Sequence, residues 1–313
     1  MKQYEEKLGR AQETLRTAAE VNQFYKKPLI ITDSGGKDST VLKYVAEQCL
    51  EPWEWEIVHN VTTMDASVTM QFIRQERLRY RAKGIPYTLR KPLYKGTPTT
   101  IWKEIVRQGT PPTRLNRYCC RIFKEANTPN RLIVTGVRAD ESTGRSLRKA
   151  FELRGKTKKD AKRYTEEHVK SVLDDALRVS EELQLGIEQE TAYDCTFIRS
   201  AKQKKDAICN PLLDFTESDI WNVIRDKGLP VNPVYDEQKC FRCGCVGCPQ
   251  AGRRQRLEQF QYNPEFKVRF VKAFDAMLER GREKGKQYSW KTGKDVFDWW
   301  LEDDAFPGQM TLF

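Results

Sequence analysis

Residues 29–50 read LIITDSGGKDSTVLKYVAEQCL, and this stretch decides the fold. A short apolar run turns through Gly35 and Gly36 into a helical pattern that begins near Ser39. Glycine permits a tight turn, and the start of a helix points backbone N–H groups and the positive end of its dipole at one place. Because this arrangement suits a phosphate group, the sequence predicts a nucleotide site here.

The spacing of this loop separates it from the Walker A loop, which needs a longer gap between glycine and lysine than Gly36 and Lys37 provide. The string resembles instead the SGGxDS pyrophosphate loop of the ATP pyrophosphatase superfamily. The resemblance implies ATP with Mg²⁺ as the cofactor. It also implies a set of nucleotide-binding residues: Ser34, Gly35, Gly36, Lys37, Asp38, Ser39 and Thr40. The alternative is an ordinary strand-to-helix turn that Ser39 or Thr40 only caps.

Asp33 departs from the pattern of this loop, because relatives often carry an apolar or hydroxyl residue there. A carboxylate beside a phosphate site repels the anion unless Mg²⁺ or Lys37 intervenes. Asp33 therefore either contacts a metal ion or points away from the site.

The composition limits the classes of protein to be considered. The chain has 313 residues, a formal net charge of +11 and a mean hydropathy of −0.72, and it has no apolar run of membrane length. The first residues, MKQYEEKLGR, lack the apolar region of a secretion signal, so we expect a cytoplasmic protein. Nine cysteines then indicate metal ligands or redox chemistry rather than disulfides, and only two histidines argue against a histidine-built zinc hydrolase.

Strand and helix patterns alternate along the first half of the chain. Alternation of this kind predicts an α/β fold with a doubly wound, mainly parallel, five-stranded sheet. The expected strands are 29–33, one within 53–65, 86–91, 131–137 and a return to the core at 210–214. The expected helices are 3–24, 39–50, 68–83, 99–108, 158–190 and 216–227.

These patterns suggest a domain organisation. We expect an N-terminal helix at 1–24, a nucleotide-binding core at 25–144 and 208–235, a basic helical insertion at 145–207, a cysteine-rich loop with helices at 236–300, and a tail at 301–313. The insertion would lie at the carboxyl ends of the strands, where open α/β sheets bind ligands.

The positive charge gathers in the insertion. Nine Lys and Arg residues lie between Arg145 and Arg163, against only Glu152 and Asp160. A polyanionic partner, nucleic acid first, explains such an excess, although a solvated helix face is the alternative.

The cysteines form two groups that point to a metal centre. Cys119 and Cys120 are adjacent, and a second run follows at Cys240, Cys243, Cys245 and Cys248, whereas Cys49, Cys195 and Cys209 are isolated and suit a buried core. The four cysteines of the second run could form a zinc site by themselves. The alternative joins the Cys119–Cys120 pair to the second run.

Two further segments complete a family resemblance. Residues 136–142, GVRADES, place Gly136 and Arg138 at the end of a predicted strand, where a guanidinium can clamp a phosphate or sulfate, with Arg145 three residues beyond. Residues 211–221 read PLLDFTESDIW, with Thr216 at a helix start.

Taken in order, these landmarks resemble the phosphoadenosine phosphosulfate reductase family of the adenine nucleotide α-hydrolase-like fold over about residues 25–250. The resemblance implies a [4Fe–4S] cluster held by Cys119, Cys120, Cys245 and Cys248, with Cys240 and Cys243 as spare thiols or alternative ligands. It implies catalytic roles for Lys37, Asp38 and Arg138, and phosphate or substrate binding by Arg138 and Arg145. The resemblance fails at the tail, FDWWLEDDAFPGQMTLF, which lacks the C-terminal cysteine that reductases of the family use as a nucleophile.

The last five residues suggest a partner. QMTLF resembles the peptide by which bacterial proteins bind the DNA sliding clamp, with Gln309, Leu312 and Phe313 as anchors. The alternative is a tail whose Leu-Phe pair folds back on its own core. We expect the nearby aromatic residues to close a hydrophobic core; they are Trp290, Phe297, Trp299, Trp300 and Phe306.

These observations lead to one functional hypothesis and two rivals. The hypothesis is an ATP-pyrophosphatase-like enzyme that adenylates a nucleic acid, DNA in preference to tRNA, for sulfur transfer with a [4Fe–4S] cluster. The sulfur would come from a donor such as a cysteine desulfurase. The first rival is a sulfonucleotide reductase, and the second is a non-catalytic, clamp-associated DNA-binding protein with structural Zn²⁺.

Overall fold

We analysed the protein through a computed structural model, which describes residues 3–125, 131–146, 148–153 and 207–302. The predicted helix at 158–190, most of the basic insertion, Cys195 and the tail with Gln309, Leu312 and Phe313 lie outside the described residues. The helices are α1 Gln3–Asn22, α2 Lys37–Cys49, α3 Ser67–Ala82, α4 Ile101–Gln108, α5 Tyr118–Cys120, α6 Thr143–Ser146, α10 Glu217–Asp226, α11 Val234–Glu237, α12 Arg253–Tyr262, α13 Pro264–Glu283 and α14 Gly293–Glu302. The strands are β1 Leu29–Thr32, β2 Trp55–Asn60, β3 Tyr87–Arg90, β4 Leu93–Tyr94, β5 Thr97–Pro98, β6 Leu132–Val134, β7 Phe151–Leu153 and β8 Ala207–Cys209.

The chain forms two compact units. The first comprises residues 1–59, 74–88 and 128–231, and the second comprises residues 60–73, 89–127 and 232–313.

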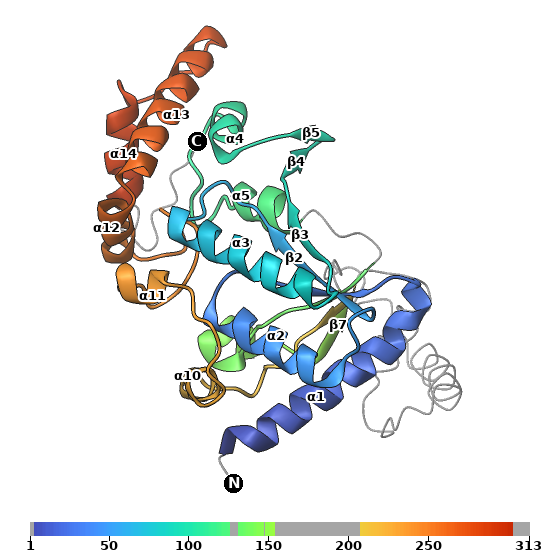
Figure 1. The fold of residues 1–313 in the computed structure, drawn as a ribbon. Helices are drawn as coiled ribbons and strands as arrows, with labels where there is room; N and C mark the ends of the chain where they lie inside the picture. Colours follow the sequence, from blue (N-terminus) through green and yellow to red (C-terminus); the bar gives the residue numbers. More distant parts are fainter. Residues whose placement is uncertain (1–2, 126–130, 147, 154–206, 303–313) are drawn as a thin grey trace, which may run out of the picture. The chain divides into compact units, whose positions relative to one another are not determined.

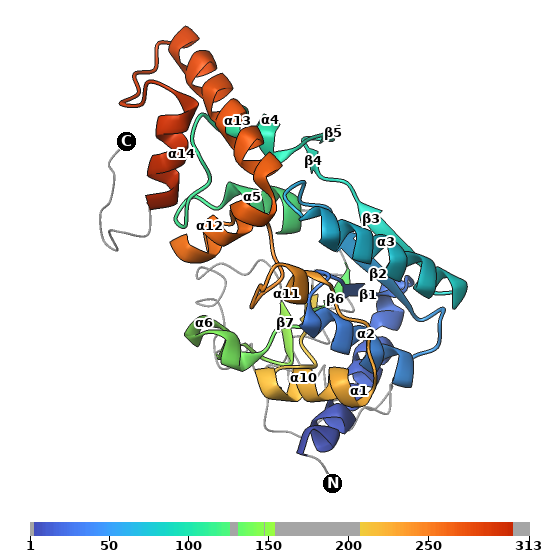
Figure 2. The ribbon, with the colours of Figure 1, turned by 60° about the vertical axis from the view of Figure 1, so that its left-hand side comes forward.

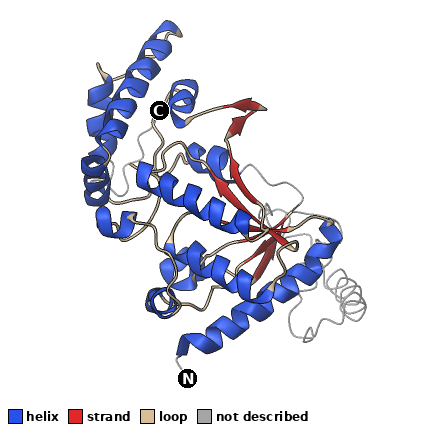
Figure 3. Ribbon diagram, viewed as in Figure 1, coloured by secondary structure: helices blue, strands red, loops and turns tan. Residues whose placement is uncertain are grey.

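The first unit is built on a mainly parallel sheet. The strand order is β3-β2-β1-β6-β8-β7, in which β1 runs parallel to β2 and β6, and β6 runs parallel to β8. Figure 1 labels β2, β3 and β7 of this sheet, and Figure 3 colours the strands red. The predicted α/β class and mainly parallel sheet are confirmed, but the sheet has six strands rather than five. The sequence did not predict β7, an antiparallel edge strand of three residues that pairs with β8. The predicted return to the core at 210–214 was wrong as a strand: β8 ends at Cys209, and 211–214, which begins with a proline that lacks an N–H, forms a turn.

Helix α1 packs on this sheet through apolar residues at helical spacing. Leu8, Ala11, Leu15, Ala18 and Val21 of α1 are all buried. Helix α1 packs against α2, α10, β1 and β8, so it covers the strands at the centre of the sheet. Burial of aliphatic side chains at this spacing supplies the main favourable free energy of such a layer.

The second unit is mostly helical around an aromatic core. Helices α13 and α14 lie side by side (Figure 2), and α13 also packs on α4 and α12. Phe297 and Trp300 are buried in this core with Phe260 and Phe270, while Trp290 and Trp299 pack against it half-buried. The expectation that the C-terminal aromatic residues close a core is confirmed for Trp290, Phe297, Trp299 and Trp300; Phe306 lies outside the described residues.

No helix within the described ranges is long and apolar enough to cross a membrane.

Candidate functional site: a phosphate loop and a thiol cluster

The predicted nucleotide loop joins β1 to α2 in the first unit. Gly35 has a φ of 72°, a backbone conformation that favours glycine, and Gly36 is the residue before the first turn of α2. Since Gly36 has no side chain to cap the helix, the N–H groups of the first turn point out of its end. The loop therefore has the backbone form that the sequence predicted for a phosphate site.

Side chains inside the loop hold this form. The Asp33 carboxylate accepts hydrogen bonds from the Gly35 N–H at 2.7 Å and from the Ser39 hydroxyl at 2.9 Å. The Ser34 hydroxyl accepts from the Gly36 N–H at 3.3 Å, and Thr40 Oγ1 donates to the Gly36 carbonyl at 3.3 Å. Ser34, Ser39 and Thr40 thus shape the turn as well as flanking the predicted phosphate position.

Asp33 points into the core and not toward a bound metal. Its second carboxylate oxygen accepts from Lys43 Nζ and from the Tyr87 hydroxyl, both at 2.6 Å, and Lys43 also reaches Glu76 at 2.9 Å. Burial alone would raise the pKa of Asp33, but the charge and hydrogen bond of Lys43 outweigh it and hold this pKa well below its usual value. Asp33 is therefore a structural anchor under the loop.

Three of the predicted catalytic residues meet beside the loop. Arg138 Nε donates to the Asp38 carboxylate at 2.6 Å, and Lys37 Nζ lies 3.8 Å from that carboxylate. A Cβ on Gly136 would stand 3.3 Å from the backbone carbonyl of Asp38, so a glycine lets strand β6 pass close to the loop. The predicted group of Lys37, Asp38, Arg138 and Gly136 is therefore assembled at one place.

Arg145 reaches this group only through Glu141. It lies in α6 and forms an ion pair with Glu141, whose carboxylate also accepts from the Arg138 N–H at 3.3 Å. These contacts thus place the Arg138 guanidinium on Asp38 and the Arg145 guanidinium on Glu141.

The charges beside the loop are nearly balanced. Burial would lower the pKa of Arg138, but the carboxylates of Asp38 and Asp140 outweigh it and raise this pKa. Asp140 also accepts from the Glu217 N–H at 2.9 Å, and the Glu217 carboxylate lies 3.5 Å from Lys37 Nζ. Two cations therefore face three carboxylates, Asp38, Asp140 and Glu217. A triphosphate would be repelled by these acids unless a divalent cation accompanied it.

The second unit gathers four thiols from two distant segments. Cys119 and Cys120 lie in α5, which continues into a π-helical turn at Arg121–Glu125, while Cys245 and Cys248 lie in the loop before α12. Cys119 and Cys245 are buried, and Cys120 and Cys248 pack against the same core half-buried. The hydrogen bond with Cys120, burial, and the charges of Cys120, Cys245 and Cys248 all raise the pKa of Cys119. The sequence prediction that these two groups meet is thus matched by their placement.

Polar neighbours surround the thiols. The Cys245 thiol donates to Thr62 Oγ1 at 3.4 Å. The backbones of Asp65 and Cys245 pair in an isolated antiparallel β-bridge. The charges of Cys245, Cys248 and Cys120 raise the pKa of Lys124, so a cation belongs to the same cluster. Sequence reasoning missed Lys124, although its position four residues after Cys120 places it one helical turn away.

Cys240 and Cys243 have other neighbours. The Cys243 sulfur accepts from Asn232 Nδ2 at 3.4 Å and lies 3.8 Å from Thr69 Oγ1. Burial and the charge of Glu258 raise the pKa of Cys240. The charges that raise the pKa of Cys119 most are those of Cys120, Cys245 and Cys248, so these four thiols are treated as the cluster, with Cys240 and Cys243 still predicted as spare thiols or alternative ligands.

The thiol cluster shares its donor type, the cysteine sulfur, with iron–sulfur centres. Within the described ranges, no group of three or more His, Cys, Asp or Glu side chains is arranged to hold a metal ion. The charges of Cys120, Cys245 and Cys248 raise the pKa of Cys119, a conflict that bound iron would relieve by stabilising thiolates. Four thiolates are the ligand set of a [4Fe–4S] cluster.

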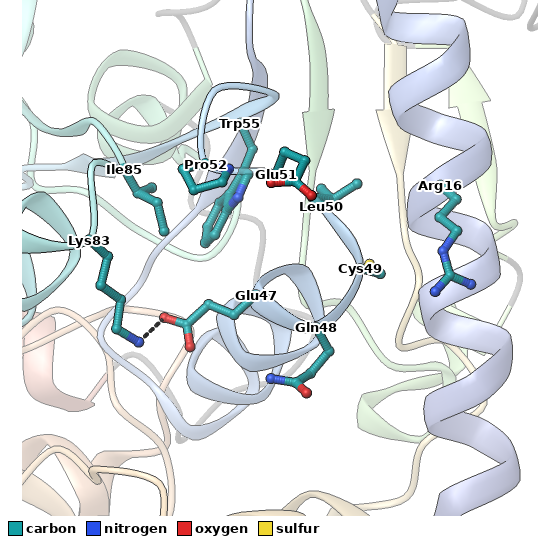
Figure 4. A pocket seen from close by; sticks show the side chains of 10 residues that line it. All are labelled: Arg16, Glu47, Gln48, Cys49, Leu50, Glu51, Pro52, Trp55, Lys83 and Ile85. Carbon is teal, nitrogen blue, oxygen red and sulfur yellow. Dashed lines mark hydrogen bonds and ion pairs between the residues drawn. The ribbon is translucent and has the colours of Figure 1, made fainter.

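A hollow of about 470 Å³ in the first unit is not part of either site. Trp55 at the amino end of β2, Cys49 and Arg16 line it, and Lys83 and Glu47 point toward one another with a 2.8 Å ion pair (Figure 4). Burial raises the pKa of Cys49 to about 11, so its thiol is unreactive at neutral pH. Because ligands of open α/β sheets bind at the carboxyl ends of strands, this hollow at an amino end is not the nucleotide site.

Comparison with known proteins supplies the family. Among curated proteins, none matches this chain. Among solved structures, the phosphoadenylyl-sulfate reductase of Candida auris in a phosphate complex is similar at 15% identity and a TM-score of 0.41, covering 72% of this chain and 83% of that one. The FMN adenylyltransferase of Candida glabrata, in complex with FAD and pyrophosphate, is similar at 14% identity and a TM-score of 0.40, covering 74% of this chain and 59% of that one. The U34-tRNA thiolase of Methanococcus maripaludis, with its [4Fe-4S] cluster, is similar at 12% identity and a TM-score of 0.39, covering 88% of this chain and 81% of that one.

The sequence match, and not these structures, decides the family. Residues 28–251 match the phosphoadenosine phosphosulfate reductase domain, a range that begins just before β1 and ends just after Cys248. The match therefore contains the phosphate loop, Arg138 and the whole thiol cluster. The chain belongs to the phosphoadenosine phosphosulfate reductase domain family.

Proposed function

We propose that this protein is an ATP-pyrophosphatase-like enzyme that adenylates a nucleic acid for sulfur transfer and uses a [4Fe–4S] cluster. The single observation that carries the proposal is the meeting of Cys119, Cys120, Cys245 and Cys248 in a chain whose family domain also holds a formed phosphate loop. A nucleotide site alone is compatible with many enzyme activities. A nucleotide site in the same chain as a cluster of four cysteine thiols favours sulfur chemistry.

The nucleotide half of the proposal uses the groups beside the loop. The N–H groups of the first turn of α2 would bind the β and γ phosphates of ATP, with Lys37 and Arg138 neutralising charge. Asp38 orients Arg138 through their 2.6 Å hydrogen bond. The excess of carboxylates over cations supports a requirement for Mg²⁺.

The chemistry would proceed in two balanced steps. An oxygen of the acceptor attacks the α phosphorus of ATP, the bond to the β phosphate breaks and pyrophosphate leaves. A sulfide-level sulfur from a donor, such as the persulfide of a cysteine desulfurase with its reductant, then forms a bond to the activated atom and AMP leaves. The [4Fe–4S] cluster, when bound, would supply a place for sulfur or electrons near Lys124.

Nucleic acid is proposed as the acceptor on the grounds of charge. The chain has a formal net charge of +11, concentrated in sequence between Arg145 and Arg163. DNA is favoured over tRNA because Gln309, Leu312 and Phe313 resemble a sliding-clamp peptide. The cytoplasm is the proposed compartment.

Pyrophosphate release tests the proposal. Wild-type protein with MgATP should release pyrophosphate faster when single-stranded DNA or tRNA is added. Lys37→Met and Arg138→Met should each lower this rate about 100-fold, the cost of losing one charge-stabilising donor. Arg10→Gln removes an exposed cation of the same unit and serves as the matched control. ATP binding without pyrophosphate release would contradict the proposal and favour the non-catalytic, zinc-bearing binding protein.

A sulfonucleotide reductase is the second candidate, and the family match favours it. Cys243, with hydrogen-bonding neighbours Asn232 and Thr69, would then replace the tail cysteine as nucleophile. This candidate predicts sulfite release from adenylyl sulfate with a thiol reductant, and its loss in Cys243→Ser. Absence of sulfite under these conditions would exclude it.

A further inference from the structure

The second unit contains a basic groove between α4 and α13 that neither site described above uses. The groove has a volume of about 610 Å³. Its lining residues are Trp102, Lys103, Val106, Arg107, Arg269, Lys272, Ala273, Ala276 and Arg280. Five of these nine side chains are cationic and none is acidic, so the groove carries one sign of charge.

Most of this charge is not neutralised inside the described part of the chain. No carboxylate among the described residues pairs with Lys103, Lys272 or Arg280, and all three are exposed. Arg107 pairs with Glu104, a buried residue, and stacks over Tyr94 at 4.4 Å. Cations on the same helix face repel one another, so the free groove favours an anionic occupant.

The floor of the groove is apolar and aromatic. Trp102 packs its indole against Phe270, with ring centroids 4.8 Å apart at an angle of 76°, and against Phe266 at 6.1 Å. These contacts fix the half-buried ring, which also lines the groove. A fixed indole among cations provides a surface on which a nucleobase can stack while the cations meet its phosphates.

We infer that the groove between α4 and α13 binds single-stranded nucleic acid, with phosphates on Lys103, Lys272 and Arg280 and a base on Trp102. This inference deepens the proposed function, because it rests on nucleic acid being the acceptor and names where that acceptor is bound. It differs from the predicted contact through the basic insertion, since these residues belong to the second unit. A simple phosphate ion would need no aromatic floor, and an acidic protein would need no stacking.

Binding of labelled oligonucleotides by the full-length protein tests the inference. The groove variant is Lys103→Gln/Lys272→Gln/Arg280→Gln. Its matched control is Arg254→Gln/Lys267→Gln/Lys284→Gln, which removes three exposed cations of the same unit that do not line the groove. Removing each phosphate-binding cation should weaken affinity about fivefold at 0.1 M salt, so the groove variant should bind single-stranded DNA or RNA about 100-fold more weakly. Its salt slope should fall by about 2.

The predicted stacking of a base on Trp102 is tested with separate variants. Trp102→Leu should weaken binding of a single strand about tenfold and Trp102→Phe much less, because base stacking is worth about 1–3 kcal/mol. Neither set of variants touches the phosphate loop or the thiols, so iron content and ATP binding should be unchanged.

The outcomes separate the two proposals. Equal affinity of the groove variant and its control would overturn the groove while leaving the proposed function standing. Competition by polyglutamate as strong as that by an oligonucleotide of equal charge, with no effect of Trp102→Leu, would assign the groove to an acidic protein instead. Failure of the wild type to bind any DNA or RNA would overturn both the groove and the nucleic-acid acceptor.

Discussion

At the scale of single residues, Asp33 has the largest expected effect on stability. It is fully buried and hydrogen-bonded to Lys43 and Tyr87, and removing one of the two carboxylates that Lys43 contacts leaves its buried charge only partly compensated by Glu76. Asp33→Asn should therefore lower the free energy of unfolding by about 3–5 kcal/mol, as measured by urea denaturation. Asp214→Asn is the control, because its ion pair with Arg10 is exposed and should contribute little. Equal losses in the two variants would contradict this account of Asp33.

The same carboxylate predicts a pH dependence. The pKa of Asp33 in the folded protein lies well below its ordinary value of 3.8, so the unfolded chain binds more protons as the pH falls. The stability that Asp33 contributes is thus fully present above about pH 4 and is lost as the pH drops through its folded pKa. The difference in unfolding free energy between wild type and Asp33→Asn should be smaller at about pH 3 than at about pH 6, with the decrease falling below about pH 4. A difference that stays constant over this range would show that the ion pair is not its cause.

Asp33 also shows that a sequence pattern alone does not determine which partners a buried carboxylate contacts. The sequence left open whether its carboxylate meets a metal or points away. The answer depended on Lys43, ten residues along the chain, and on Tyr87, which comes from the separate strand β3. By contrast, Gly35, Gly36 and Lys37 could be placed from sequence, because a strand–glycine–helix string has one favourable geometry.

At the scale of secondary-structure elements, the loop that carries Cys245 and Cys248 depends on Gly247. Its φ is 70°, and a Cβ there would stand 2.6 Å from Phe260 Cζ and 3.0 Å from Trp300. Gly247→Ala should destabilise the protein by about 2–4 kcal/mol and lower the iron content, because the strain and the clash displace the thiols. Gly244→Ala is the matched control, since nothing lies within 4 Å of its Cβ. Thermal unfolding and iron analysis of both variants measure the effect, and equal behaviour would contradict it.

Elements differ in how well the sequence predicted them. Thr216 caps α10 as expected, in a capping box where its side chain accepts from the Asp219 N–H and the Asp219 carboxylate accepts from the Thr216 N–H, because this signal is local. Strand β7 was missed, since three residues beside a basic run carry no period that identifies a strand. The π-helical turn after Cys120 was also missed, because its form depends on packing against the second unit's core.

At the scale of the whole molecule, the sequence order hides the division into units. Residues 60–73 and 89–127 belong with the C-terminal residues in one unit, while 74–88 belong with the sheet. The sequence predicted one interruption of the core, at 145–207, because the charge pattern changes there. No change of composition marks 60–73 or 89–127, so their place in the second unit could not be derived from the sequence. The meeting of two distant cysteine groups, by contrast, could be predicted, because the family resemblance assigns both groups to one cluster by their order along the chain.

The most direct test of the central claim is metal analysis of protein purified without oxygen. We would measure iron, sulfide and zinc, with visible spectra, for the wild type, Cys119→Ser, Cys245→Ser and the control Cys49→Ser, whose thiol lines a separate hollow. The account predicts a brown wild type with about four irons, loss of iron in both Cys119→Ser and Cys245→Ser, and no loss in the control. Colourless protein with about one zinc that survives Cys119→Ser would contradict it.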